Sequence, residues 1–136
     1  MNSNRKTGTG FEKDLCMSLS GYGFWAHNLA QNRQGQPFDV IASINGNTYV
    51  IDCKVCDNDT FRLDRIEQNQ ETAMEAWEAA GNTPGYFALR LKNGAVYFFT
   101  FRSLMAYRDD IKSLSKEKIE SVGTPLDWWV KLACSY

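Results

Sequence analysis

The feature that most constrains the fold is an Asn-Gly pair at residues 45–46, between two segments of alternating apolar residues. Asn-Gly flanked by such segments is the strongest short-range signal for a β-hairpin, because both residues tolerate the positive φ angles of the turn. We therefore predict strands over residues 38–44 and 47–56. If residues 45 and 46 form the turn, residue 44 pairs with 47, and the two numbers of every later pair add up to 91.

This register predicts that two carboxylates face each other. Asp39 lies opposite Asp52, and directly opposed side chains have Cβ atoms about 5 Å apart on one face of a sheet. Lys54 shares that face, since strand side chains alternate with period two, and the other face carries an apolar set suited to a core. Two such carboxylates repel each other unless a cation or a proton lies between them. The alternative is a solvated strand face, on which Asp52 and Lys54 form a surface ion pair worth less than ~1 kcal/mol.

Other segments extend the pattern on both sides of the hairpin. Thr9 is a candidate N-cap for a helix whose apolar stripe includes Phe11, Leu15 and Leu19. Residues 1–8 are polar, and we expect a mobile N-terminal arm. We expect further strands over residues 24–29, 86–91 and 95–101, helices over residues 66–80 and 103–111, and loops over residues 30–37 and 57–60. This order, α-β-β-β-α-β-β-α, predicts an α/β fold in which helices flank a mixed sheet.

Composition limits the remaining possibilities. The 136 residues match one domain, and 43% hydrophobic residues exclude wholesale disorder. The net charge of −1 excludes a uniformly basic surface that coats nucleic acid, although a local basic patch remains open. No apolar segment approaches the ~20 residues of a membrane helix, and the first ten residues lack the apolar core of a secretion signal. We expect a single cytoplasmic domain with no membrane partner, whose four cysteines need not form disulfides.

Two polar residues on the expected helices are candidates for the same site. Gln70 lies between Ile66 and Met74 on the apolar stripe of the second helix, so the stripe points its amide toward the face that holds Lys54. Glu12 follows Phe11 at the edge of the first stripe. The alternatives are a boundary glutamine bonded to the backbone, and a first-turn acid favoured by the helix dipole.

In this order and spacing, the residues resemble the PD-(D/E)xK nuclease superfamily. The resemblance rests on Glu12 in Gly-Phe-Glu, Asp39 in Pro-Phe-Asp, Asp52 and Lys54 in Ile-Asp-Cys-Lys, and Gln70 on the next helix. More narrowly, the residues resemble Holliday junction resolvases of the archaeal type and of the RecU type found in Gram-positive bacteria and their phages. The Phe-x-Leu segment at residues 61–63 adds to the RecU likeness. Two departures are the shorter Asp52 where the family more often has Glu, and the tight 45–46 turn where the RecU type carries a long stalk.

The resemblance implies a restriction-endonuclease-like fold and a Mg²⁺-dependent site, in which Mn²⁺ may replace Mg²⁺. Asp39 and Asp52 would bind the ion, the backbone carbonyl of Cys53 would be a third ligand, and Glu12 would hold a water of the ion's shell or a second metal ion. Lys54 would orient the attacking water or stabilise the developing charge, and Gln70 would position Lys54 or that water. Such chemistry suits Mg²⁺, which takes one or two carboxylates and keeps several waters.

Other candidate sites are weaker. Cys53 and Cys56 have zinc-knuckle spacing, but no second pair accompanies them, and an iron–sulfur cluster would need Cys16 and Cys134 to converge on them. For His27, the only histidine, we expect a structural role. Basic residues that could contact DNA phosphates lie in the arm, in the polar loop and before the second helix: Arg5, Lys6, Arg33, Arg62 and Arg65.

We therefore predict a metal-dependent DNA endonuclease, a phage-type Holliday junction resolvase that acts as a homodimer in a bacterial or phage-infected cell. Two symmetric cuts in a four-way junction require two active sites, which pairing about a twofold axis supplies. Within enzymes, the alternative is a nuclease of the same fold with another DNA substrate, of the nicking or restriction type. From another class, it is a DNA-binding or structural descendant that has lost cleavage.

Overall fold

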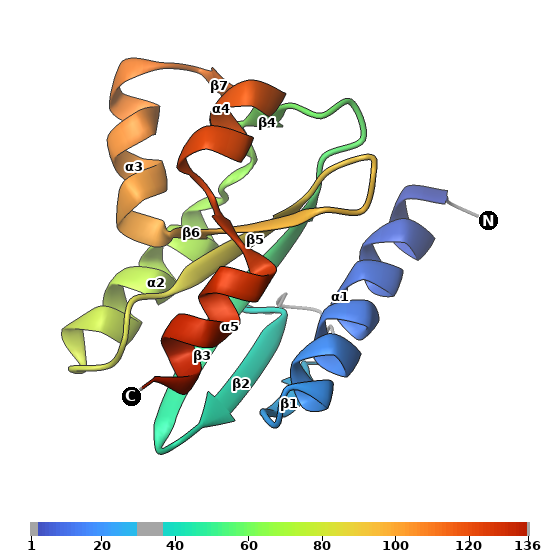
Figure 1. Cartoon of the computed structure of the whole chain (residues 1–136). Coiled ribbons are helices and arrows are strands. Elements are labelled where there is room, and N and C mark those ends of the chain that lie inside the picture. The colour runs from blue at the N-terminus through green and yellow to red at the C-terminus, as the bar shows by residue number, and fades with distance from the viewer. Residues whose placement is uncertain (1–2, 30–36, 136) are drawn as a thin grey trace.

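The computed structural model describes residues 3–29 and 37–135, and side chains from residue 10 onward within those ranges. Its centre is a six-stranded sheet in the order β1-β2-β3-β5-β6-β8, with helices on both faces (Figure 1). The strands are β1 (Trp25–Asn28), β2 (Val40–Ile44), β3 (Asn47–Val55), β5 (Tyr86–Arg90), β6 (Val96–Thr100) and β8 (Thr124–Pro125). The helices are α1 (Ser3–Gly21), α2 (Gln68–Ala79), α3 (Phe101–Asp110), α4 (Lys116–Val122) and α5 (Leu126–Cys134). A two-stranded sheet joins β4 (Phe61–Arg62) to β7 (Ser113–Leu114), and a short 3₁₀ helix spans Leu63–Arg65.

The β2–β3 hairpin confirms the predicted register over residues 40–44 and 47–51. Val40 pairs with Ile51 and Ile44 pairs with Asn47. Asn45 has a φ of 53° and Gly46 a φ of 81°, the left-handed conformation that a tight two-residue turn needs. β3 and β5 run parallel, whereas the other pairs in this sheet are antiparallel, so the expected mixed sheet is also confirmed.

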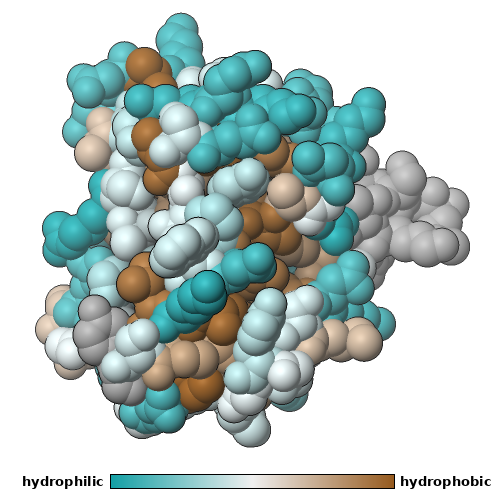
Figure 2. Space-filling model, in the orientation of Figure 1, coloured by the Kyte–Doolittle hydropathy of each residue, from teal (hydrophilic) through white to brown (hydrophobic). Residues whose placement is uncertain are grey.

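Apolar side chains cover both faces of the sheet. On one face, α2, α3 and α4 enclose residues such as Val50, Phe87 and Leu89. On the other, α1 and α5 enclose a second cluster that includes Ile51 and Trp129. On the side of α1 and α5, hydrophobic patches lie between hydrophilic side chains (Figure 2). Because both faces are covered, the face that carries Asp52 is part of the interior rather than a solvated surface.

Several boundaries differ from the sequence predictions. The helix expected after an N-cap at Thr9 begins at Ser3, so residues 3–8, expected to be a mobile arm, have helical backbone. The apolar stripe shows where α1 packs on the sheet, not where its backbone begins. α4, α5 and the short strands β4, β7 and β8 were not predicted, because two-residue strands and helices of seven to nine residues carry too little periodicity. The loop expected at residues 30–37 falls almost wholly outside the described residues.

No helix in the described ranges is long and apolar enough to cross a bilayer.

Candidate active site

Three predicted site residues meet between β3 and α2. Asp52 is 1% exposed, and its Oδ2 lies 3.3 Å from Lys54 Nζ. Gln70 joins them: its Nε2 donates to Asp52 Oδ1 over 3.2 Å, and its Oε1 accepts from Lys54 Nζ over 3.3 Å. The Lys54 side chain is 12% exposed. The solvated surface pair considered as the alternative is therefore wrong, because both charges lie in a largely enclosed site.

Gln70 is held in place by the start of its own helix. Its Oε1 also accepts from the backbone N–H of Glu67 over 3.0 Å, and the Glu67 side chain accepts from the backbone of Gln70 in return. This reciprocal capping box satisfies two free donors at the helix start. It also orients the amide, so that the NH₂ group is directed at Asp52. Glu67 was missed from the sequence, although Glu-x-x-Gln ahead of an apolar stripe is a version of this helix-start signal.

Asp39 directly precedes the first residue of β2, and its backbone hydrogen bonds differ from those of the predicted register. The paired residues begin at Val40, and the Asp39 N–H donates to Ile51 O over 3.0 Å, one residue short of Asp52. The predicted ladder pair between Asp39 and Asp52 is therefore wrong. Its Oδ2 instead accepts from the Cys53 N–H over 2.8 Å. A local departure from pairing of this kind is a common way to aim a side chain near a functional site.

Glu12 brings α1 to the same carboxylates. Burial, followed by the charge of Asp39 and a hydrogen bond to it, raises the pKa of Glu12 to about 7. The predicted meeting of Glu12 with the hairpin is thus present. With a pKa near 7, the Glu12 carboxyl group is only partly ionised at neutral pH, first because burial disfavours its charged form and then because Asp39 lies close to it.

Burial also raises the pKa of Asp52 well above its usual range. The charge of Lys54 acts in the opposite direction, and the charge of Asp39 adds to the increase. Asp52 Oδ2 is buried and has no hydrogen-bond donor of suitable geometry within the described residues. Three carboxyl groups and one ammonium group therefore share this small volume. Full ionisation of the carboxyl groups would leave an excess of negative charge, which a bound cation would offset.

These residues fit a divalent ion of the Mg²⁺ type. The described residues contain no ready-made cage of three or more His, Cys, Asp or Glu side chains. Mg²⁺ does not require one, because it binds through one or two carboxylates and keeps several waters. Asp39 and Asp52 supply hard oxygen ligands. Asp52 Oδ2 has no hydrogen bond of suitable geometry within the described residues, so beside its ion pair with Lys54 it keeps the capacity to bind such an ion.

The cysteines are placed differently from a metal-binding pair. Cys53 packs with the cluster under α1, whereas Cys56 is buried in the cluster on the α2 side. Two residues three positions apart on a strand and its extension point to opposite faces. Burial raises the pKa of Cys56 to about 11, which favours a neutral thiol. Both positions therefore suit packing better than metal binding.

The predicted DNA contacts are only partly described. The side chains of Arg5 and Lys6 and the whole of Arg33 lie outside the described residues. Arg62 forms an ion pair with Asp64. Arg65 Nη1 donates to Val55 O over 2.9 Å, and its guanidinium lies over the Phe61 ring. Arg65 therefore also fastens the end of β3, a role that its loop position in the sequence did not suggest.

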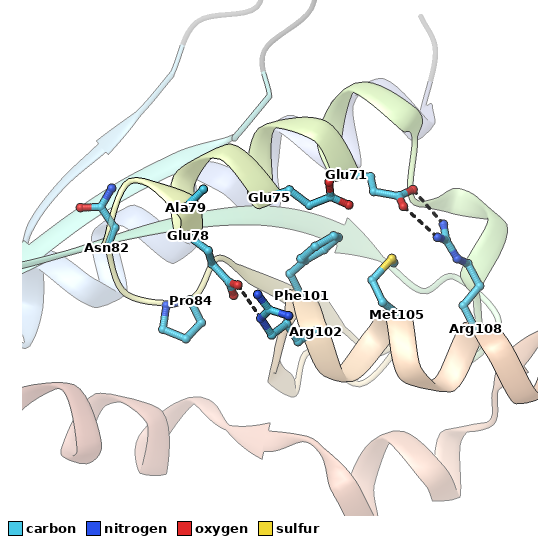
Figure 3. Close-up of a pocket in the computed structure, with 10 residues that line it drawn as sticks. All are labelled: Glu71, Glu75, Glu78, Ala79, Asn82, Pro84, Phe101, Arg102, Met105 and Arg108. Carbon is cyan, nitrogen blue, oxygen red and sulfur yellow. Dashed lines mark hydrogen bonds and ion pairs between the residues drawn. The ribbon is translucent and has the colours of Figure 1, made fainter.

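A separate groove of about 800 Å³ lies between α2 and α3 (Figure 3). Two ion pairs cross it, Arg108 with Glu71 and Arg102 with Glu78, and Glu75 adds a third carboxylate. Its charges are mostly used between the two helices. This groove is an unfavourable path for a phosphate backbone, which the carboxylates would repel.

Comparison with known proteins decides the family. Residues 25–136 match RecU, described as Recombination protein U. The chain belongs to the RecU family. It is accordingly a Holliday junction resolvase of the PD-(D/E)xK superfamily, a DNA-binding nuclease of recombination, as the arrangement of Asp39, Asp52 and Lys54 indicated.

The fold of this RecU-family chain recurs in a solved archaeal enzyme. The structure of Hjc, a Holliday junction resolvase from the hyperthermophile Archaeoglobus fulgidus, matches with a TM-score of 0.67 and 19% sequence identity. The match covers 89% of this chain and 95% of Hjc. It confirms the restriction-endonuclease-like fold predicted from the sequence. A comparison with curated protein sequences found no match.

Proposed function

We propose that this RecU-family nuclease cleaves four-way DNA junctions with Mg²⁺, or Mn²⁺ in its place, at the site formed by Glu12, Asp39, Asp52, Lys54 and Gln70. The observation that carries the proposal is the buried Oδ2 of Asp52. It forms an ion pair with Lys54 Nζ over 3.3 Å, has no hydrogen bond of suitable geometry within the described residues, and lies near Asp39 and a pKa-raised Glu12. When bound, the ion supplies a Lewis acid that polarises the phosphoryl oxygen and lowers the pKa of water.

Each residue then has a specific task. Asp39 and Asp52 hold the ion, with the Cys53 carbonyl as a further ligand. The Cys53 N–H keeps Asp39 Oδ2 oriented over 2.8 Å. Glu12, whose pKa lies near neutrality, binds the attacking water and can accept its proton. Lys54 stabilises the negative charge that develops on the phosphate, and Gln70 keeps the ammonium group beside Asp52.

We further propose that the active form is a homodimer that works with the DNA in the cytoplasm of a bacterial or phage-infected cell. A junction has twofold symmetry, and paired cuts need two sites related by a twofold axis. One copy of the chain holds one such site.

The test is cleavage of labelled DNA of the same sequence as a four-way junction, as a duplex and as a single strand, with Mg²⁺ or with EDTA. We expect paired nicks in the junction that depend on Mg²⁺ and little cutting of the other two substrates. Equal cutting of duplex would instead identify a nicking or restriction-type nuclease. Binding without cleavage under every metal condition would identify a descendant that has lost activity.

A further inference from the structure

Two aromatic side chains form an exposed stack on the edge strand β1. The rings of Trp25 and His27 are nearly parallel, at 17°, with centroids 5.9 Å apart. Trp25 is 63% exposed, and His27 is exposed as well. An indole this exposed adds nothing to the core. β1 is an outer strand of the sheet, so the stack lies at the sheet edge.

The stack lies on the same face of the sheet as Asp52 and Lys54. Ala26, between the two rings, packs with the cluster under α1, so Trp25 and His27 point to the opposite face. His27 pairs with Ile41, which pairs with Val50, and Asp52 is the next residue of β3 on that face. Two strand spacings and two residue steps separate His27 from Asp52, a distance on the order of 12 Å between their Cα atoms.

The strand segments around the stack carry no carboxylate. Residues 25–28 and 40–48 contain no Asp or Glu. Ser43 and Thr48, which pair across β2 and β3 beside Trp25, offer hydroxyl groups instead. The groove between α2 and α3 carries three glutamates and is the contrasting case (Figure 3). A nucleic acid that reaches the stack therefore meets no carboxylate on β1, on β2 or at the start of β3.

We propose that the Trp25–His27 stack is a platform for a nucleobase at the strand-exchange point of the junction. The inference rests on the proposed function and adds a residue pair that selects the substrate's shape. In continuous duplex, each base has both faces covered by its neighbours. At the strand-exchange point of an open junction, the stacking of the bases is interrupted. One face of a base is then free to stack on the exposed indole of Trp25. His27 supports the indole from behind and acts as a positioning residue.

Stacking makes a different contribution from phosphate contacts. A base–aromatic contact is worth a measurable share of affinity but releases no counterions, so its loss leaves the salt dependence of binding unchanged. Because duplex DNA offers no free base face inside its stack, the loss should weaken binding of junctions more than binding of duplex. The platform thus predicts a change in selectivity, not a uniform loss.

The experiment measures binding of a four-way junction and of a matched duplex in Ca²⁺, at several salt concentrations, for wild type, Trp25→Ala, Trp25→Phe and His27→Ala. We expect Trp25→Ala to bind the junction roughly 5- to 100-fold more weakly, the range for one lost base stack, with an unchanged salt slope. Trp25→Phe should retain most of the affinity. The control is Trp128→Ala, because Trp128 is 60% exposed on α5, on the other side of the sheet. Its affinity should stay at the wild-type value.

A second readout locates the base directly. 2-Aminopurine placed at the exchange point should lose fluorescence when wild type binds, and should lose much less with Trp25→Ala. The platform is refuted if junction affinity and quenching are the same in Trp25→Ala and wild type. The platform is also refuted if Trp25→Ala binds the junction with wild-type affinity but has half the wild-type protein mass by light scattering. That result would show that Trp25 contacts a second copy of the protein and not DNA. Both measurements use Ca²⁺, so a failure of Mg²⁺-dependent cleavage would count against the proposed function alone.

Discussion

Gln70 Nε2 donates to Asp52 Oδ1 over 3.2 Å and so ties the first turn of α2 to the middle of β3. The bond joins the helix layer to the sheet, and the capping box with Glu67 fixes the orientation of the Gln70 side chain. The Gln70 amide also helps to position Lys54, because its Oε1 accepts a hydrogen bond from the ammonium group of Lys54. The start of α2 is therefore part of the candidate active site and not only a neighbour of it.

Lys54 should matter for turnover and not for binding. Lys54→Ala removes a charge that acts mainly in the transition state, whereas affinity for DNA comes from many phosphate contacts. We expect junction affinity in Ca²⁺ within a few-fold of wild type. Cleavage in Mg²⁺ should be at least ~100-fold slower, the scale of losing one preorganised charge-stabilising group. Single-turnover cleavage assays measure the difference. Lys118→Ala, which changes an exposed residue of α4, is the control and should cut normally.

A second prediction concerns Asp39 and the metal. Mg²⁺ or Mn²⁺ should raise the Tm of the wild type, since the ion binds the folded site and relieves repulsion among the carboxylates. Asp39→Asn should reduce this metal-dependent increase to near zero. Differential scanning calorimetry at millimolar metal measures the effect. An Asp64→Asn variant, which changes an exposed carboxylate in the Arg62 pair, should respond to the metal as the wild type does.

The raised pKa of Glu12 predicts a pH dependence. Its ordinary value is 4.5 and its value in the fold is about 7, so between these pH values the folded protein binds more protons than the unfolded chain. The free energy of unfolding of the metal-free protein should therefore fall as pH rises through this window. Since a metal ion competes with the same proton, metal affinity should rise over the window and level off above it.

Calorimetric titration of Mn²⁺ at pH 5.5, 6.5 and 7.5 tests this dependence and counts the protons released. Glu12→Gln should flatten the slope without abolishing it, because burial also raises the pKa of Asp52. An equal slope in Glu12→Gln and wild type would show that Glu12 does not share the site's proton.

Local signals predicted the parts of the fold that depend on neighbouring residues. The Asn45-Gly46 turn and strand alternation predicted the β2–β3 register, which the structure confirms. The sequence could not show that Asp52 is only 1% exposed, because that burial comes from packing between segments distant in the chain. Nor could it show the shift in pairing at Asp39, since one residue of slippage leaves the hydrophobic pattern of the strand almost unchanged.

The candidate site divides in the same way. The stripe on α2 correctly placed Gln70 toward Lys54, because helix periodicity fixes which residues share a face. The DNA contacts of Arg62 and Arg65 stay predictions. In the fold, each of these side chains also has a partner within the protein, Asp64 and Val55 O respectively. A loop position indicates exposure, but it does not indicate which partner a long side chain finds.

The last prediction separates the role of Gln70 from general stability. Gln70→Leu keeps the volume but leaves Asp52 Oδ1 and the Glu67 N–H without their partner. Leaving buried polar groups unpaired should lower the free energy of unfolding by about 1–3 kcal/mol. The matched control is Gln68→Leu on the same turn, whose amide bonds only Thr72 on the exposed side of α2. That variant should be nearly neutral in both stability and cleavage.

If Gln70 positions Lys54, Gln70→Leu should also lower kcat while junction affinity in Ca²⁺ stays unchanged. Measurements at a temperature where the variant is fully folded remove the contribution of stability. A Gln70→Leu enzyme with normal kcat under those conditions would contradict the positioning role. The bond between α2 and β3 would then serve only to hold the helix on the sheet, and Asp52 would be enough to orient Lys54.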